Sequence, residues 1–312
     1  MSKYVFGVDV GGTTVKMGYF DMEGNVIDKW EIPTRTENNG ENILPDIAAS
    51  INAKIADANI DKADIAGVGI GVPGPVKADG TVLVAVNLVW GEKNPNEELG
   101  ALIGVPVKTA NDANVAALGE MWRGGGQGYE DVVAVTLGTG VGGGVIIGGK
   151  VVAGSNGAGG EIGHIHLEDN ETDECGCGGH GCLEQYASAT GVVRIANKKL
   201  NESDKPSTLR DITVTAKDVW DAVKAGDELA IDVANVYGEY LGKGLAAVAN
   251  VVNPQIFVIG GGVSKAGNVL IEYMEPHFMK YAFPGAKNAK FVLAKLGNDA
   301  GIYGSARLVL DK

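Results

Sequence analysis

One pattern occurs twice in the chain and constrains its fold more than any other feature. Residues 4–20, YVFGVDVGGTTVKMGYF, align without a gap on residues 131–147, DVVAVTLGTGVGGGVII, so that Gly11 falls on Gly138. Each segment reads as a strand, a glycine turn and a second strand, because apolar β-branched residues flank the glycines. A glycine-containing turn follows both segments. A repeated supersecondary unit predicts two related α/β domains that face each other over a central cleft.

Glycine is unusually frequent and is clustered. The chain has 48 glycines in 312 residues, which is about twice the usual share of ~7%. The clusters follow apolar runs in VFGVDVGGTT, VGIGVPGP, VTLGTGVGGG and FVIGGGVS. Glycine after a strand permits a tight turn or a close approach of the backbone to a ligand. Four such clusters indicate one ligand that several loops contact.

Helix and strand signals alternate along the rest of the chain. Further strands are expected from the turn at residues 21–24 to about residue 34, and at 65–72, 105–109, 254–259 and 290–295. Helices are expected at 41–59, 95–102, 183–200, 215–225, 227–252, 266–281 and 299–310. Another helix should run from Asn111-Asp112 to about Arg123, with Asp112 as its N-cap.

Charge and composition exclude several classes of partner. The net charge is −13, and nucleic acids and anionic membranes both select basic protein surfaces. No apolar run reaches the ~20 residues needed to span a bilayer, and the N-terminus has no secretory signal pattern. We therefore expect a cytoplasmic protein that binds neither nucleic acid nor membrane. An anionic small substrate remains compatible with this charge.

All three cysteines lie between Cys175 and Cys182, in CGCGGHGC. An odd number of cysteines does not form a disulfide framework, and cytoplasmic thiols stay reduced. A metal site or a redox C-x-C pair is therefore expected. Packed thiols are disfavoured, since the glycines between them offer no apolar core. Three cysteines with one histidine form a normal closed zinc site, but spacing alone does not choose among His164, His166 and His180.

Two segments match the letters of familiar phosphate-binding motifs, but the residues or elements that follow them do not fit those motifs. Gly138, Gly140 and Gly143 match G-x-G-x-x-G, but a strand is expected after them where a dinucleotide site needs a helix. Residues 144–150 resemble a P-loop, but Val151 stands where Ser or Thr is required. We reject both readings.

The turn Asp9–Lys16, DVGGTTVK, is more informative. Its glycine amides can approach phosphate oxygens, and the Asp9 carboxylate can hold Mg2+ or its waters. An ordinary hairpin is the alternative. The matching turn at Gly138-Thr139-Gly140 and the glycines Gly260–Gly262 after a later strand favour nucleotide binding.

With these motifs in place, the chain resembles the ROK family of bacterial glucokinases and related proteins, within the hexokinase–actin ATPase superfamily. The similarity covers essentially the whole chain, and E-x-G-H with C-x-C-G-x2-G-C-x-E is very specific. The matching motifs are DVGGTTVK (9–16), GVPGP (71–75), Asn87-Leu88, Asn111-Asp112, LGTGVGGG (137–144), EIGH (161–164) and CGCGGHGCLE (175–184).

The resemblance implies an α/β fold with two actin-like ATPase (ribonuclease H-like) domains around a cleft. Residues 1–112 with about 298–312 would form a small N-terminal domain, and 113–297 a large domain with the zinc site. It also implies a structural Zn2+ held by His164, Cys175, Cys177 and Cys182. His166, His180 and His277 would take no part in catalysis.

The resemblance further implies the site residues. Asp112 would be the general base, although as a residue at a helix start it could be no more than a cap. The sugar would contact Gly74, Asn87, Asn111, Asp112, Glu161, His164 and Glu184. ATP and Mg2+ would contact Asp9, Gly11, Gly12, Thr13, Lys16, Gly138, Thr139, Gly140, Gly261 and Gly262. The acidic loop 165–174 has little apolar surface, so we expect the metal to hold it in place.

The implied activity is the ATP-dependent phosphorylation of glucose to glucose 6-phosphate by a dimer or tetramer. A kinase for N-acetylmannosamine, mannose or fructose is the alternative, and some relatives use polyphosphate as donor. Sugar-responsive repressors of the family carry an N-terminal helix-turn-helix, for which a first strand at residue 4 leaves no room. An actin-like filament protein would have no use for the sugar and zinc motifs.

Overall fold

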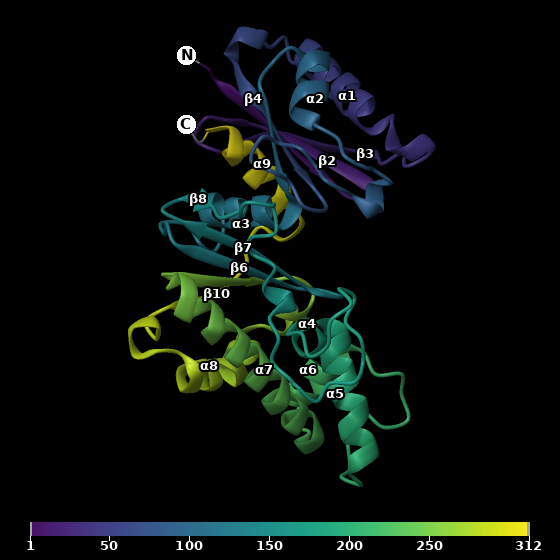
Figure 1. Ribbon diagram of the computed structural model, residues 1–312, viewed down its shortest axis with the longest axis vertical. Helices are drawn as coiled ribbons and strands as arrows, with labels where there is room; N and C mark the ends of the chain where they lie inside the picture. Colours follow the sequence, from purple (N-terminus) through teal and green to yellow (C-terminus); the bar gives the residue numbers. More distant parts are fainter. Residues whose placement is uncertain (1, 311–312) are drawn as a thin grey trace. The chain divides into compact units, whose positions relative to one another are not determined.

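The computed structural model describes residues 2–310, which form two compact units (Figure 1). Of the described residues, the first unit comprises 2–130, 144–160 and 295–310, and the second comprises 131–143 and 161–294. This division follows the packing of the chain. The domain boundaries inferred from the family resemblance stay a prediction.

The first unit is built on a sheet of order β3-β2-β1-β4-β5. Its strands are β1 (Tyr4–Val10), β2 (Thr14–Asp21), β3 (Val26–Pro33), β4 (Ile65–Val72) and β5 (Val107–Asn111). Its helices are α1 (Ile43–Asp57), α2 (Pro95–Ile103), α3 (Asp112–Arg123) and α9 (Ala300–Leu310). β1, β4 and β5 are parallel, and β2 and β3 run antiparallel to their neighbours.

The two faces of β1 pack against different helices, because successive side chains of a strand point to opposite sides. Phe6, Val8 and Val10 join a core with the buried residues of α1 and α2. The opposite face packs on α9, where a β-carbon on Gly7 would lie 1.9 Å from the carbonyl oxygen of Ile302. Asp9 follows Gly7 by two residues and so lies on the face that α9 covers.

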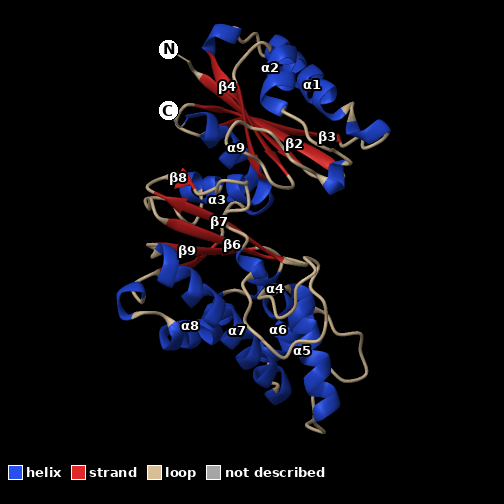
Figure 2. Cartoon of the chain, in the orientation of Figure 1, coloured by secondary structure: helices blue, strands red, loops and turns tan. Residues whose placement is uncertain are grey.

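The second sheet has the order β10-β9-β6-β7-β8, and Figure 2 labels its strands β6, β7, β8 and β9. Its strands are β6 (Val132–Leu137), β7 (Val141–Ile147), β8 (Lys150–Val151), β9 (Ile256–Gly260) and β10 (Lys290–Leu293). Read from β8, this order matches that of the first sheet strand for strand. β9 takes the place of β4, and like β4 it runs parallel to both of its neighbours. The predicted duplication is confirmed and extends over whole sheets. β7 directly follows the glycine turn, which confirms the strand expected there in place of the helix that a dinucleotide motif needs.

The helices of the second unit are α4 (Glu184–Ala187), α5 (Ala189–Glu202), α6 (Ala216–Lys224), α7 (Glu228–Val252) and α8 (Asn268–Tyr281). α7 and α8 lie side by side (Figure 1). The single helix expected at 183–200 is wrong: Ser188 is extended, with ψ of 174°, and its hydroxyl caps α5 by accepting from the amide of Gly191. Within residues 2–310, no helix is long and apolar enough to cross a membrane.

Candidate functional site

The β1–β2 turn presents Asp9 and the first glycine pair. The turn closes through the amide of Gly11, which donates to the carbonyl oxygen of Thr14 at 3.0 Å. Strand register pairs Asp9 with Lys16. A β-carbon on Gly12 would lie 3.4 Å from the carbonyl oxygen of Asn87. Residues 11–13 are exposed, so the backbone of this turn can approach a ligand.

Asp9 is a strongly perturbed acid. Its pKa is raised to about 6, chiefly by burial, while Lys16 lowers the pKa and the charge of Asp112 raises it. A β-carbon on Gly301 in α9 would lie 2.5 Å from Cγ of Asp9, so only glycine leaves room for this carboxylate. Sequence reasoning missed Gly301. A lone glycine inside a predicted helix was the available signal.

Asn111 and Asp112 stand at the junction of β5 and α3. The side chain of Asn111 caps α3 by accepting from the amides of Ala113 and Asn114, and its Nδ2 donates to the carbonyl oxygen of Gly74 at 3.1 Å. The prediction that Asp112 is the N-cap is therefore wrong, since Asp112 is the first helical residue. Its carboxylate accepts from the amide of Ala113 at 2.8 Å.

In the second unit, Glu184 is bound to the duplicated glycine turn. The amide of Val141 donates to Oε2 of Glu184 at 2.8 Å, and a β-carbon on Gly140 would lie 2.1 Å from the same oxygen. Residues at the start of α5 bind the carbonyl oxygens of Gly138 and Thr139. A residue expected to contact sugar thus rests directly on a turn expected to contact phosphate.

Gly261 and Gly262 lie in the glycine run that follows β9. Gly261 has φ of +85°, and a β-carbon there would lie 2.4 Å from the carbonyl oxygen of Leu137 at the end of β6. A β-carbon on Gly262 would meet nothing within 4 Å, so its surface is open. The glycine run after β9 therefore adjoins the turn after β6.

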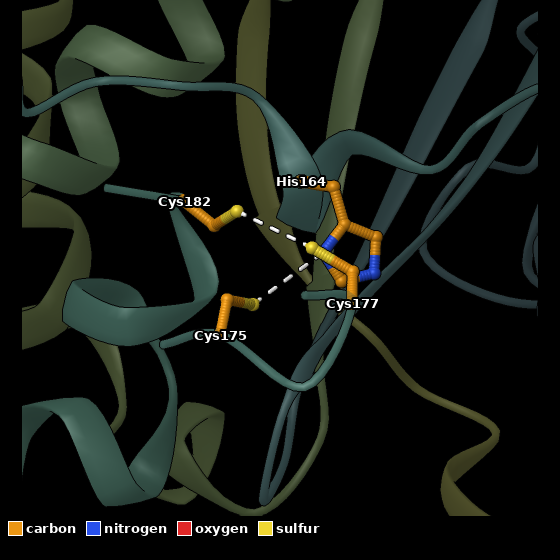
Figure 3. Close-up of side chains that lie close together, drawn as sticks. All are labelled: His164, Cys175, Cys177 and Cys182. Carbon is orange, nitrogen blue, oxygen red and sulfur yellow. Dashed lines mark hydrogen bonds between the residues drawn. The ribbon is translucent and has the colours of Figure 1, made fainter. Parts of the chain in front are cut away.

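The three cysteines and His164 form a cluster whose ligand atoms suit a zinc ion (Figure 3). Their donor atoms lie within 4.8 Å of one another, with 3.7 Å between Sγ of Cys177 and Cys182 and 3.8 Å from Sγ of Cys175 to Nδ1 of His164. A tetrahedral zinc with Zn–S bonds of about 2.3 Å separates two sulfurs by about 3.8 Å. The donor set and its spacing therefore fit the metal.

The glutamates of both motifs adjoin this cluster. Oε2 of Glu161 lies 4.0 Å from Nε2 of His164, and Oε1 of Glu184 lies 3.8 Å from Sγ of Cys175. His166 instead binds Asp169 and the carbonyl oxygen of His180. The structure thus places His164 in the cluster and His166 outside it.

Polar contacts hold the acidic loop 165–174, and the expectation that a metal also holds it stays a prediction. Arg194 of α5 binds Glu171 at 2.6 Å and Asp173 at 3.1 Å, and Tyr186 donates to Glu171 at 2.5 Å. The bond from Arg194 lowers the pKa of Glu171 to about 2. Tyr240 donates to Glu168 at 3.0 Å. Charge-assisted hydrogen bonds replace the apolar contacts that the loop lacks.

Two sheets of one topology, each with a glycine turn between its antiparallel strands, define an α/β protein of the actin-like ATPase class, which confirms the predicted fold class. The chain belongs to the ROK family, whose model matches residues 5–312 and confirms the family resemblance.

Individual relatives match over nearly full length. The glucokinase of Halalkalibacterium halodurans is 43% identical over 313 residues, covering 98% of this chain and 95% of its own. N-acetylgalactosamine kinase AgaK of a Shewanella species is 32% identical, covering 97% and 96%. The ROK family glucokinase of Streptomyces griseus, solved with glucose and AMPPNP, has a TM-score of 0.73 at 34% identity, covering 99% of this chain and 100% of its own.

Proposed function

We propose that this protein is an ATP-dependent glucokinase that converts glucose to glucose 6-phosphate. The observation that carries the proposal is the full-length similarity to curated glucokinases, at 43% identity for the Halalkalibacterium halodurans enzyme. The resemblance at Asn111-Asp112 and Glu161–His164 supports it, because these residue types can hydrogen-bond vicinal sugar hydroxyls.

Asp112 acts as the general base. A carboxylate within hydrogen-bond reach of the attacking hydroxyl accepts its proton as the phosphoryl group is transferred. Asn111 keeps Asp112 in place by capping α3 and binding Gly74. The backbone amides of each glycine turn bind phosphate oxygens, and Lys16 lies beside the first turn. Asp9 would hold Mg2+, which when bound neutralises charge on the transferring phosphoryl group.

The Cys/His cluster holds one structural zinc. His164, Cys175, Cys177 and Cys182 supply four protein ligands, which complete a tetrahedral site and leave no position for substrate. The ligands adjoin Glu161 and Glu184, so the cluster positions two sugar-binding glutamates. We further propose a cytoplasmic homo-oligomer, dimer or tetramer, without nucleic acid or membrane partners.

A coupled ADP-release assay tests the function. We expect the purified protein to give its highest kcat/KM with glucose among glucose, mannose, fructose, N-acetylmannosamine and N-acetylgalactosamine. The last sugar is included because a relative at 32% identity is an N-acetylgalactosamine kinase. Asp112→Asn, purified in parallel, controls for contaminating kinases. A higher kcat/KM for another hexose would reassign the substrate, and no hexose-dependent ADP release would refute a sugar kinase.

We expect that replacing the buried Asp9 raises the stability of the fold and weakens the use of MgATP. Its pKa of about 6 exceeds the ordinary 3.8, so ionisation destabilises the ligand-free fold progressively as pH rises from about 4 through 6. Asp9→Asn should therefore raise Tm at pH 8, and this gain should vanish below pH 4. The same variant should raise the KM for MgATP, because the amide carries no charge for the metal.

Thermal unfolding at several pH values and kinetics across pH 5–8 check this prediction. In the wild-type protein, the KM for MgATP should rise as pH falls through about 6 and Asp9 becomes protonated. Asp57→Asn, an exposed change on α1, should alter neither quantity. An Asp9→Asn variant with no gain in Tm at pH 8 would contradict the prediction.

A further inference from the structure

Glu120 of α3 is a buried carboxylate to which the proposed reaction gives no role. It is only 4% exposed. Its oxygens accept from the amide of Gly125 at 2.8 Å, from that of Lys295 at 3.0 and 3.1 Å, and from that of Leu296 at 2.8 Å. Such bonds compensate a buried carboxylate. Glu120 thereby fastens the segment that follows β10 to the end of α3.

The other end of that segment rests on the β1–β2 turn. Nζ of Lys16 donates to the carbonyl oxygen of Asn298 at 3.2 Å. Three residues later, Gly301 lies so close to Asp9 that a β-carbon would be 2.5 Å from Cγ and 2.6 Å from Oδ2. Residues 295–301 therefore connect Glu120 to Gly301, the residue of α9 that the Asp9 carboxylate contacts.

We propose that Glu120 and Gly301 are positioning residues that hold Asp9 in the orientation required for MgATP. The proposal rests on the proposed function, which assigns Asp9 to the metal–nucleotide side of the site. Glu120 fixes where the segment 295–301 begins, and Gly301 sets how closely α9 approaches Asp9. A misplacement of about 1 Å at a reacting group can cost about 10²-fold in rate, so this support matters for catalysis.

Glu120→Gln tests the first contact. Glutamine replaces one acceptor oxygen with an NH2 group that faces backbone N–H donors, so the start of the segment must shift. We expect the KM for MgATP to rise about tenfold while the KM for glucose stays within about twofold. Glu97→Gln, an exposed change on α2, is the matched control.

Gly301→Ala tests the second contact without altering Glu120. Alanine has the higher helix propensity, so a loss of function at this position must come from the contact with Asp9. We expect the same selective rise in the KM for MgATP. If Glu120→Gln fails to fold, this variant decides the question.

A measurement without substrates separates the inference from the proposed function. The pKa of Asp9 can be followed by carbon-13 NMR of its carboxyl group, assigned with Asp9→Asn. Lys16 and Asp112 also act on this group, and both are kept in the two test variants. We expect each variant to move the pKa of Asp9 away from the wild-type value, because its enclosure changes.

The inference is overturned if folded Glu120→Gln and Gly301→Ala both keep the wild-type KM for MgATP and the wild-type pKa of Asp9. It is equally overturned if the KM values for both substrates rise alike, since that indicates general destabilisation. Absence of glucose-dependent ADP release in the wild type and in Glu97→Gln would refute the proposed function alone, while the NMR titration would still decide whether Asp9 is positioned.

Discussion

Asp112→Asn should lower kcat for glucose phosphorylation by at least ~10²-fold, the low end for general-base catalysis, with little change in the KM for glucose. The amide has the shape of the carboxylate but cannot accept the proton. The fold should survive, because the cap of α3 is Asn111. Steady-state kinetics, together with glucose binding by calorimetry, measure the two effects separately.

The control for this variant is Asp57→Asn, which removes one carboxylate from an exposed position on α1. It should keep the wild-type kcat. An Asp112→Asn enzyme with more than half of the wild-type kcat would exclude Asp112 as the base. Loss of glucose binding with little loss of kcat would assign Asp112 to sugar recognition instead.

Removal of the metal should have the second-largest effect. Cys177→Ser should lower zinc content from about one per chain, the stoichiometry of one Cys3His site, and should raise the KM for glucose or abolish activity before global unfolding. Glu161 and Glu184 adjoin the cluster, so both should shift when it opens. Arg194 still binds Glu171 and Asp173, so the acidic loop should stay in place.

Elemental analysis, glucose kinetics and thermal unfolding of the variant measure these three outcomes. His166→Gln is the matched control, because His166 lies in the same loop but outside the metal cluster. It should keep both zinc and the KM for glucose. The zinc proposal fails if active wild-type enzyme contains no zinc, or if Cys177→Ser changes neither metal content nor glucose affinity.

The contact of Glu184 with the second glycine turn alters what metal loss should do to nucleotide binding. In the structure, Oε2 of Glu184 accepts from the amide of Val141, so a shift of Glu184 should disturb the turn at 138–140. The turn at Gly11-Gly12 belongs to the first unit and is closed by its own bond from Gly11 to Thr14, so we expect it to be unaffected.

The sequence by itself determined the features that depend on local patterns. Alternating apolar residues around Gly11 and Gly138 predicted the duplicated strand pairs, since strand periodicity and glycine turns are short-range properties. The spacing of Cys175, Cys177 and Cys182 predicted a metal or redox site for the same reason. The ROK resemblance rested on motifs distributed along nearly the whole chain, and the family match confirmed it.

Only the tertiary structure decided which distant residues meet. Gly301 faces Asp9, Glu120 binds Lys295 and Leu296, and Arg194 holds the acidic loop. These partners are between 21 and 292 residues apart in sequence, and no periodicity links them. The break at Ser188 and the cap at Asn111 were also decided there. In both cases several neighbouring polar residues could cap the helix, and only the backbone path selects which side chain reaches the free amides.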